Sequence, residues 1–261
     1  MKNEQVFARV EQKYGLSEEQ AAAFLELAGP YLKPDARPEY TLRNIYLDSP
    51  DDRMIIRSLE KPLYKEKLRL RAYGKPGAEG PLFLEMKKKS DGIVFKRRIT
   101  LTAGEIPACL KGEGLKEKGQ IGRELDYMFT SYRPVPKAYI AYDRQAWSGA
   151  FNPDLRVTMD RRIRYRLGDL DISSPSPEEM LAMDSEVILE IKFQDAYPLW
   201  LAEILSHLRL QKTSFSKYGR VYRITHTAAL SGLVRQEKTE ESKCLHPYLP
   251  GHHPDFSYYP Y

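Results

Sequence analysis

Segments in which charged and apolar residues alternate recur along most of the chain, and they limit the folds open to it. In residues 64–73, basic side chains at Lys67 and Arg69 flank Leu68, and the alternation continues on both sides. Successive side chains of a β-strand point to opposite faces, so each segment predicts a strand with one charged and one apolar face. Eight strands are predicted, with less regular alternation in the second and sixth: 6–14, 39–48, 64–73, 82–89, 93–101, 137–147, 155–160 and 187–193.

Turn residues between these segments favour antiparallel pairing. Ser90-Asp91-Gly92 joins 82–89 to 93–101 and has Asp-Gly at its tip, a common hairpin signal. Ser17 and Gln20 resemble a capping box at the start of a helix. Helical patterns predict helices in 17–32, 51–59, 103–111, 119–131 and 198–209, and 168–180 is interpreted as a surface loop.

Composition is typical of an ordinary globular protein, and the low cysteine content predicts a cytoplasmic one. The 261 residues are 42% hydrophobic and 30% charged, with a net charge of +5. No apolar stretch approaches the roughly 20 residues of a membrane span, and the first residues are too polar for a signal peptide. Two cysteines far apart build neither a zinc site nor a disulfide framework. Residues 1–230 are predicted to form one domain, and 231–261 an irregular tail.

The charged faces of the predicted strands are strongly basic. Eleven cations stand against four acids, Glu11, Glu85, Asp160 and Glu190. A solvated sheet face is one interpretation, but like charges on neighbouring strands repel each other. The alternative is a closed sheet whose lumen holds a polyanion, for which the planar fork of arginine suits phosphate oxygens. The cations are Arg9, Lys13, Lys67, Arg69, Arg71, Lys87, Lys96, Arg98, Arg144, Arg156 and Lys192.

Three of the acids share a strand face with a lysine two residues later. The pairs begin at Glu11, Glu85 and Glu190. They can form local salt bridges, or the carboxylates can hold Mn²⁺ or Mg²⁺ that bridges to phosphate. The chain lacks the phosphate-binding loop G-x-x-x-x-G-K-[ST], the dinucleotide motif G-x-G-x-x-G and the protein-kinase motifs.

Several runs together are similar to a known family. The runs YTLRNIYLDS, YKEKLRLRAYG, FLEMKKK, FKRRITL, AYDRQAW, LRVTMD, ILEIK and SFSKYG resemble, in order, the vacuolar transporter chaperone (VTC) domain over residues 5–225. This is the polyphosphate polymerase domain of the triphosphate tunnel superfamily. The resemblance implies an α+β fold, an antiparallel eight-stranded β-barrel with a basic lumen and flanking helices. It also implies transfer of the ATP γ-phosphate onto inorganic polyphosphate with release of ADP.

The resemblance implies roles for individual residues. Arg69, Arg71, Lys87, Glu190 and Lys217 are the expected catalytic residues. Metal binding is expected of Glu190, with Glu11 and Glu85 added from their place among the cations. The expected phosphate-binding residues are Arg9, Lys13, Lys67, Lys96, Arg98, Arg144, Arg156, Lys192 and Ser216.

One departure from the superfamily favours a polymerase. Many of its triphosphatases begin with E-x-E-x-K, whereas this chain has Arg9 in place of the first glutamate. Two alternatives stay open: a triphosphatase or polyphosphate hydrolase with the same tunnel, and a polyphosphate-binding module without turnover. The predicted ligands are ATP and polyphosphate, and no specific nucleic acid, because the basic faces have few aromatics for base stacking. The regulatory SPX domain and membrane helices of the eukaryotic complex are absent from the sequence, so a separate membrane or regulatory partner stays open.

Overall fold

The computed structural model describes residues 10–60, 62–74, 81–90, 93–194, 196 and 198–227. A first compact unit ends at Tyr222, and Arg223 begins a second unit. The fold and the site below belong to the first unit. Arg9 and the predicted tail, 231–261, lie outside the described residues.

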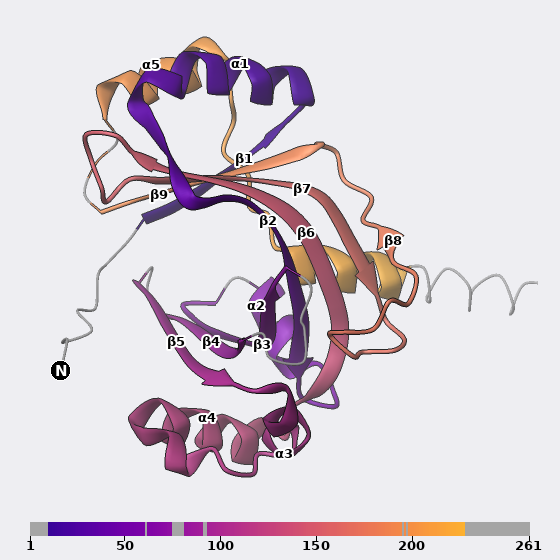
Figure 1. The fold of residues 1–261 in the computed structure, drawn as a ribbon. Coiled ribbons are helices and arrows are strands. Elements are labelled where there is room, and N and C mark those ends of the chain that lie inside the picture. Colours follow the sequence, from indigo (N-terminus) through magenta and orange to yellow (C-terminus); the bar gives the residue numbers. More distant parts are fainter. Residues whose placement is uncertain are drawn as a thin grey trace, which may run out of the picture. The chain divides into compact units, whose positions relative to one another are not determined.

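One antiparallel sheet forms the centre of the first unit (Figure 1). Eight of its nine described strands follow the path β1-β9-β7-β6-β2-β3-β4-β5, and the ninth, β8, pairs with β7. All eight predicted strands are present, three of them with the predicted bounds. The strands are β1 (Val10–Leu16), β2 (Leu32–Asp48), β3 (Tyr64–Tyr73), β4 (Leu82–Ser90), β5 (Ile93–Leu101), β6 (Val135–Gly149), β7 (Arg156–Arg166), β8 (Glu179–Met180) and β9 (Val187–Phe193).

The sheet curves so strongly that strands far apart in its path face each other across its concave side. β1 is at one end of the path and β4 is next to the other end, yet Lys87 of β4 contacts Glu11 of β1 at 3.2 Å. Among the described residues no backbone ladder joins β1 to β5, and the side-chain contact between β1 and β4 spans the concave side instead. The predicted α+β fold, an antiparallel sheet with flanking helices, is confirmed.

The convex side carries the apolar faces of the strands and buries them in two clusters. In one cluster, strands β2 to β5 pack on α3 (Ile106–Leu110) and α4 (Gly119–Tyr132). In the other, β1, β7 and β9 pack on α1 (Glu18–Ala28) and α5 (Leu199–His207). Each fully buried Leu or Phe of these clusters contributes about 1.5–3 kcal/mol, so the two cores fix which face of the sheet the helices cover.

The helices begin and end where local signals place them. The capping box of Ser17 and Gln20 is present at the start of α1, as predicted. Gly29 and Pro30 end that helix in the short 3₁₀ turn η1 (Gly29–Tyr31), earlier than the predicted end at residue 32. The predicted helix over 103–111 consists of η2 (Ala103–Glu105) followed by α3. The remaining elements are α2 (Arg53–Leu59), η3 (Lys116–Lys118) and a helix that begins at Lys217.

Two strands are longer than their alternation predicts. β2 begins at Leu32 although Pro34 and Pro38 disfavour a strand interior, and its pairing with β6 shifts register between Pro34 and Glu39. β7 continues to Arg166 past another register shift, close to Arg162, whose φ is +45°. Such bulges insert a residue and reverse which side chains face the core, so the alternation is interrupted there.

Candidate functional site

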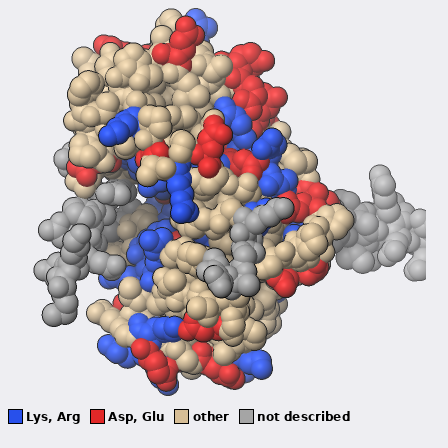
Figure 2. All heavy atoms as spheres, in the orientation of Figure 1, with Lys and Arg blue, Asp and Glu red and all other residues tan. Residues whose placement is uncertain are grey.

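The concave face of the sheet collects cations from strands far apart in the sequence. Figure 2 shows Lys and Arg side chains where the surface is hollowed. Arg9 lies outside the described residues, and Lys217 joins the face from the helix after α5. The ten other predicted cations lie on this face in cross-strand register: Lys13, Lys67, Arg69, Arg71, Lys87, Lys96, Arg98, Arg144, Arg156 and Lys192.

Glu85 organises the two arginines of β3. Its Oε2 accepts hydrogen bonds from Arg69 Nε at 2.9 Å and Nη2 at 2.7 Å, and Arg71 Nη1 lies 3.5 Å away. Lys96 contacts the other carboxylate oxygen at 2.9 Å. Burial alone would raise the pKa of Glu85, but the charges of these three cations lower it to about 2. The carboxylate is therefore ionised at neutral pH, and it holds the guanidinium groups in a fixed orientation.

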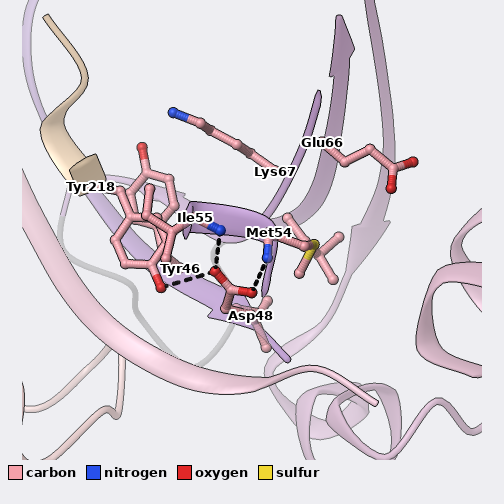
Figure 3. Close-up of a pocket in the computed structure, with 9 residues that line it drawn as sticks. Tyr46, Asp48, Met54, Ile55, Glu66, Lys67 and Tyr218 are labelled. Atoms are coloured by element: carbon pink, nitrogen blue, oxygen red, sulfur yellow. Dashed lines mark hydrogen bonds between the residues drawn. The ribbon is translucent and has the colours of Figure 1, made fainter. Parts of the chain in front are cut away.

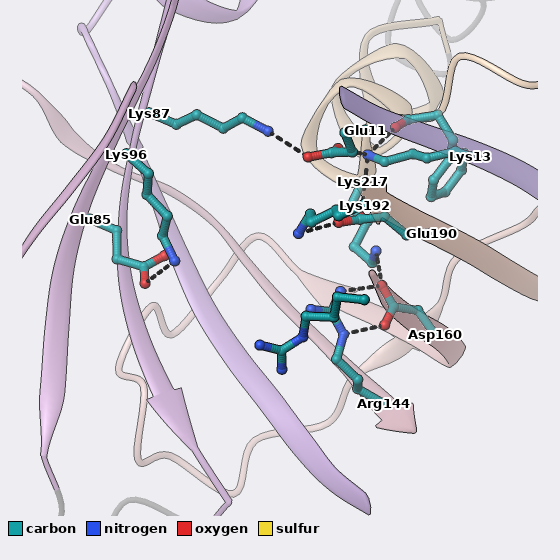
Figure 4. A network of polar contacts seen from close by, with 12 residues as sticks. Glu11, Lys13, Glu85, Lys87, Lys96, Arg144, Asp160, Glu190, Lys192 and Lys217 are labelled. Carbon is teal, nitrogen blue, oxygen red and sulfur yellow. Dashed lines mark hydrogen bonds and ion pairs between the residues drawn. The ribbon is translucent and has the colours of Figure 1, made fainter. Parts of the chain in front are cut away.

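Asp160 orients cations in the same way on the opposite side of the concave face, the wall that β1, β9, β7 and β6 form, as Figure 4 shows. Arg144 donates to its two oxygens at 2.6 and 2.8 Å, and Lys217 Nζ lies 2.5 Å from Oδ2. Burial alone would raise the pKa of Asp160, but Arg144 and Lys217 lower it to about 2. In the predicted strands Asp160 is one of the four acids of the basic face, and no role is predicted for it.

Glu11 and Glu190 form an acidic pair on this wall. The ammonium of Lys13 lies 3.2 Å from Glu11 and 3.8 Å from Glu190, so the two carboxylates approach the same atom. Lys192 contacts Glu190 at 2.5 Å. Glu190 is buried and Glu11 is half-buried. Burial and the repulsion between the two carboxylates disfavour their charge, yet the surrounding lysines lower the pKa of Glu11 to about 2 and that of Glu190 well below its ordinary value.

This pair is the part of the face that fits a divalent cation. Mg²⁺ is commonly held by one or two carboxylates together with substrate phosphates, and both carboxylates here are ionised. The described residues contain no group of three or more His, Cys, Asp or Glu side chains suited to a metal, so phosphate oxygens would complete the coordination. Glu85 lies on the other wall among Arg69, Arg71 and Lys96, and its predicted metal role stays a prediction.

The 212–218 segment closes one end of the concave face. Lys212 pairs with Tyr14 of β1, and the backbone N–H of Thr213 donates to the carbonyl of Lys13. Lys13 Nζ in turn donates to the carbonyl oxygen of Phe215 at 3.0 Å. The predicted site residue Ser216 accepts a hydrogen bond from Lys67 Nζ at 2.8 Å. The segment thus links β1, β3 and, through Lys217, β7.

Three lysines on this face are held where their charge is costly. Burial, together with the neighbouring cations, lowers the pKa of Lys67 to about 8. Burial likewise lowers the pKa of Lys96 to about 8, although Glu85 opposes the shift. The pKa of Lys87 is also lowered by burial. An incoming polyanion would relieve this cost, because its charge stabilises the ammonium form.

Sequence reasoning missed the uncharged side chains that orient the arginines. Asn44 accepts from Arg71 Nε at 2.9 Å, and the Tyr142 hydroxyl lies 3.2 Å from Arg71 Nη2. The Lys217 ammonium lies 4.2 Å from the centre of the Tyr142 ring. The period-2 position of Asn44 and Tyr142 in predicted strands could have placed them on the basic face.

Asp48 anchors the helix that carries Lys217, in the pocket of Figure 3. Its buried carboxylate accepts from the N–H groups of Met54 and Ile55 at 2.9 Å and from the Tyr218 hydroxyl at 3.3 Å. Tyr218 also stacks on Tyr46, with ring centroids 4.8 Å apart. These contacts of Tyr218 fix the start of the helix and so hold the neighbouring Lys217 and Ser216 in place.

Two predicted phosphate-binding residues lie at the margin of the face. Arg156 is 45% exposed and pairs with Asp35 at 2.8 Å. The Arg98 guanidinium lies 4.6 Å from the centre of the Phe83 ring. Among the contacts of the described residues, neither side chain joins Glu85 or Asp160.

Several solved structures are similar to this chain in fold. One is a candidate adenylate cyclase from Bacillus halodurans, with 14% identity, a TM-score of 0.49, and coverage of 80% of this chain and 95% of that chain. Another is a candidate adenylyl cyclase from Hippeastrum with a dominant triphosphatase activity, with 14% identity, a TM-score of 0.46, and coverage of 83% and 96%. Similarity at this level indicates neither the activity nor the substrate of this chain.

A search of curated proteins finds no significant match. No helix among the described residues has the length and apolar character needed to cross a membrane. The family comparison is specific, because the VTC domain matches residues 8–226, which include all the described strands and the 212–218 segment. The chain therefore belongs to the VTC domain family.

Proposed function

We propose that the protein is a polyphosphate polymerase, which transfers the γ-phosphate of ATP to the end of an inorganic polyphosphate chain and releases ADP. The observation that carries the proposal is the concave face, where cations from seven strands and the 212–218 segment surround four ionised acids. Phosphoryl transfer needs little covalent help from a protein. It needs cations around the phosphate oxygens and reactants held in line.

The contacts suggest a division of roles. Arg69 and Arg71, oriented by Glu85, bind the nucleotide phosphates. Lys87 and Lys217 face the space between the two walls and neutralise charge on the group in transfer. The other basic residues of the face bind the polyphosphate chain, with Ser216 as a hydroxyl contact at the closed end.

Glu190 and Glu11 are the residues that would hold Mg²⁺ or Mn²⁺. When bound, such an ion neutralises charge on the phosphate oxygens of the substrate. Their low pKa keeps both carboxylates ready to bind a cation at neutral pH. Glu190→Gln should abolish turnover and the dependence on metal while leaving part of the ATP affinity. Lys13 and Lys192, which now contact these carboxylates, would then be free to contact phosphate.

A triphosphatase with the same cations is the second candidate. The two reactions differ only in whether water or a phosphate chain reaches the γ-phosphate. Arg9 favours the polymerase, since a basic residue at that sequence position replaces a metal-binding glutamate of many triphosphatases. We place the reaction in the cytoplasm, with ATP and polyphosphate as its ligands.

A product gel distinguishes these candidates. The protein is incubated with ATP and either Mn²⁺ or Mg²⁺, and the products are resolved beside polyphosphate standards, with Glu190→Gln as the control. Chains together with ADP are expected from the wild type. Orthophosphate without chains would establish hydrolysis, and binding of polyphosphate without any ATP consumption would reduce the protein to a binding module.

A further inference from the structure

Three aromatic side chains form a row at one end of the concave face. The rings of Tyr40 and Tyr73 lie 5.5 Å apart, and the Tyr73 and Phe83 rings meet edge to face at 5.8 Å. They come from β2, β3 and β4, and all three side chains are partly exposed. Partly exposed aromatics on a face otherwise lined by charges offer a kind of contact that inorganic phosphate cannot use.

The aromatic row adjoins the arginines that bind phosphate in the proposed function. Phe83 is the cross-strand partner of Arg71, and Tyr40 is the partner of Arg144. Tyr73 lies two residues beyond Arg71 on the same face, which corresponds to about 7 Å along the strand. Arg98 lies over the Phe83 ring and adds a planar cation beside the row.

The opposite end of the face has a different character. Lys67 lies six residues before Tyr73, about 20 Å along β3, and there it contacts Ser216 of the 212–218 segment. The face therefore runs from aromatic rings, past Arg71 and Arg69, to lysines at the closed end. A ligand that matches this sequence has a flat ring at one end and a chain of phosphates at the other.

We propose that the Tyr40–Tyr73–Phe83 row binds the base of the nucleoside triphosphate. This inference rests on the proposed function and adds an orientation to it. The base stacks on the aromatic row, the α- and β-phosphates meet Arg71 and Arg69, and the γ-phosphate points toward Lys67 and the 212–218 segment. The other aromatics of the face are less suited, because Tyr46 and Tyr142 are almost fully buried and already contact Tyr218 and Lys217.

Binding of ATP and of inorganic tripolyphosphate, measured by calorimetry with Mg²⁺, tests the row, because the second ligand has the phosphates without the base. Wild type should bind ATP more tightly than tripolyphosphate. Tyr73→Leu and Tyr40→Leu should each weaken ATP binding about tenfold, since stacking of one base is worth roughly 1–3 kcal/mol, and should leave tripolyphosphate binding within about twofold. Tyr73→Phe keeps the ring and should keep the ATP affinity.

Tyr127→Leu is the matched control, because Tyr127 is 69% exposed on α4, away from the sheet's concave face. Equal wild-type affinities for the two ligands, or equal losses for both in the Leu variants, would overturn the proposal. The readout is binding rather than turnover. A wild type that makes no chains would defeat the polymerase proposal and leave this test intact.

Discussion

Arg71 lies almost fully buried on the concave face, and its guanidinium is held by Asn44, Tyr142 and Glu85. A donor oriented this firmly costs no reorganisation when charge develops on a transferred phosphoryl group. Arg71→Ala should therefore lower kcat/KM for ATP by on the order of 30- to 1000-fold, equivalent to about 2–4 kcal/mol.

The control for this variant is Arg53→Ala, since Arg53 is 65% exposed and pairs only with the exposed Asp51 in the contacts that the structure gives. Steady-state ADP release from both variants provides the comparison. Unchanged kinetics in Arg71→Ala would show that this arginine does not contact the substrate, whatever the effect of the control.

The lowered pKa values of Lys67 and Lys96 predict that polyphosphate binding weakens in mild alkali. Burial lowers the pKa of both to about 8, so each loses its charge as the pH rises through that value. The affinity for polyphosphate should fall between about pH 7.5 and 9. In the double variant Lys67→Arg, Lys96→Arg the charges persist and the fall should be much smaller. Titrations with labelled polyphosphate across this pH range measure the affinity of the wild type and of the double variant. Affinities that fall equally with pH in the two proteins would contradict the prediction.

At the scale of single residues, charge was easier to predict than orientation. Alternation placed Arg69, Arg71 and Lys87 on one face because a strand permits only two side-chain directions. It did not reveal that Asp160 joins Arg144 to Lys217, since that contact depends on how a helix start meets β7. Neutral partners such as Asn44 carry no charge signal and were missed for that reason.

Among the elements, α2 and the helix that begins at Lys217 depend on one buried carboxylate. Asp48 accepts from two N–H groups at the start of α2 and from the Tyr218 hydroxyl. Asp48→Asn turns one acceptor oxygen into a donor that faces these N–H and O–H groups. The free energy of unfolding should fall by about 1–3 kcal/mol, as measured by urea denaturation.

The control for Asp48 is Asp184→Asn, because the Asp184 side chain is 99% exposed. A surface change of this kind should stay within about 0.5 kcal/mol of wild type. A loss in Asp48→Asn no larger than that in the control would mean that the raised pKa of the buried Asp48 carboxyl offsets its hydrogen bonds.

Strands were predictable where both faces followed a strict period of two. β3, β5 and β9 have the predicted bounds for this reason. β2 and β7 extend beyond theirs because bulges reverse the side-chain directions, and pairing with β6 supplies what local propensity does not. The short β8 has two exposed residues, which carry no periodicity.

For the whole molecule, curvature is the property that alternation does not specify. Period two predicts two faces, and a flat sheet would satisfy it equally well. The helices cover the convex side in two separate clusters, α3 and α4 in one and α1 and α5 in the other, and alternation does not predict that division. The curvature brings Lys87 to Glu11 across the face and concentrates the charge that a mild net value of +5 conceals.

The concentration of ion pairs predicts how stability responds to acid. Glu85 has a folded-state pKa of about 2, below its ordinary 4.5, so its contribution is fully present above about pH 4.5 and is lost as the pH falls toward 2. The pKa values of Glu11 and Asp160 are also lowered in the folded state, so their contributions to stability are lost in acid in the same way. Glu85→Gln should lower the free energy of unfolding at pH 7 by on the order of 2 kcal/mol, and the difference from wild type should shrink through pH 4 and 3. Urea denaturation at each pH measures it, with the isosteric but exposed change Glu179→Gln as control. A difference that stays constant down to pH 2.5 would show that Glu85 stabilises the fold by packing rather than by its charge.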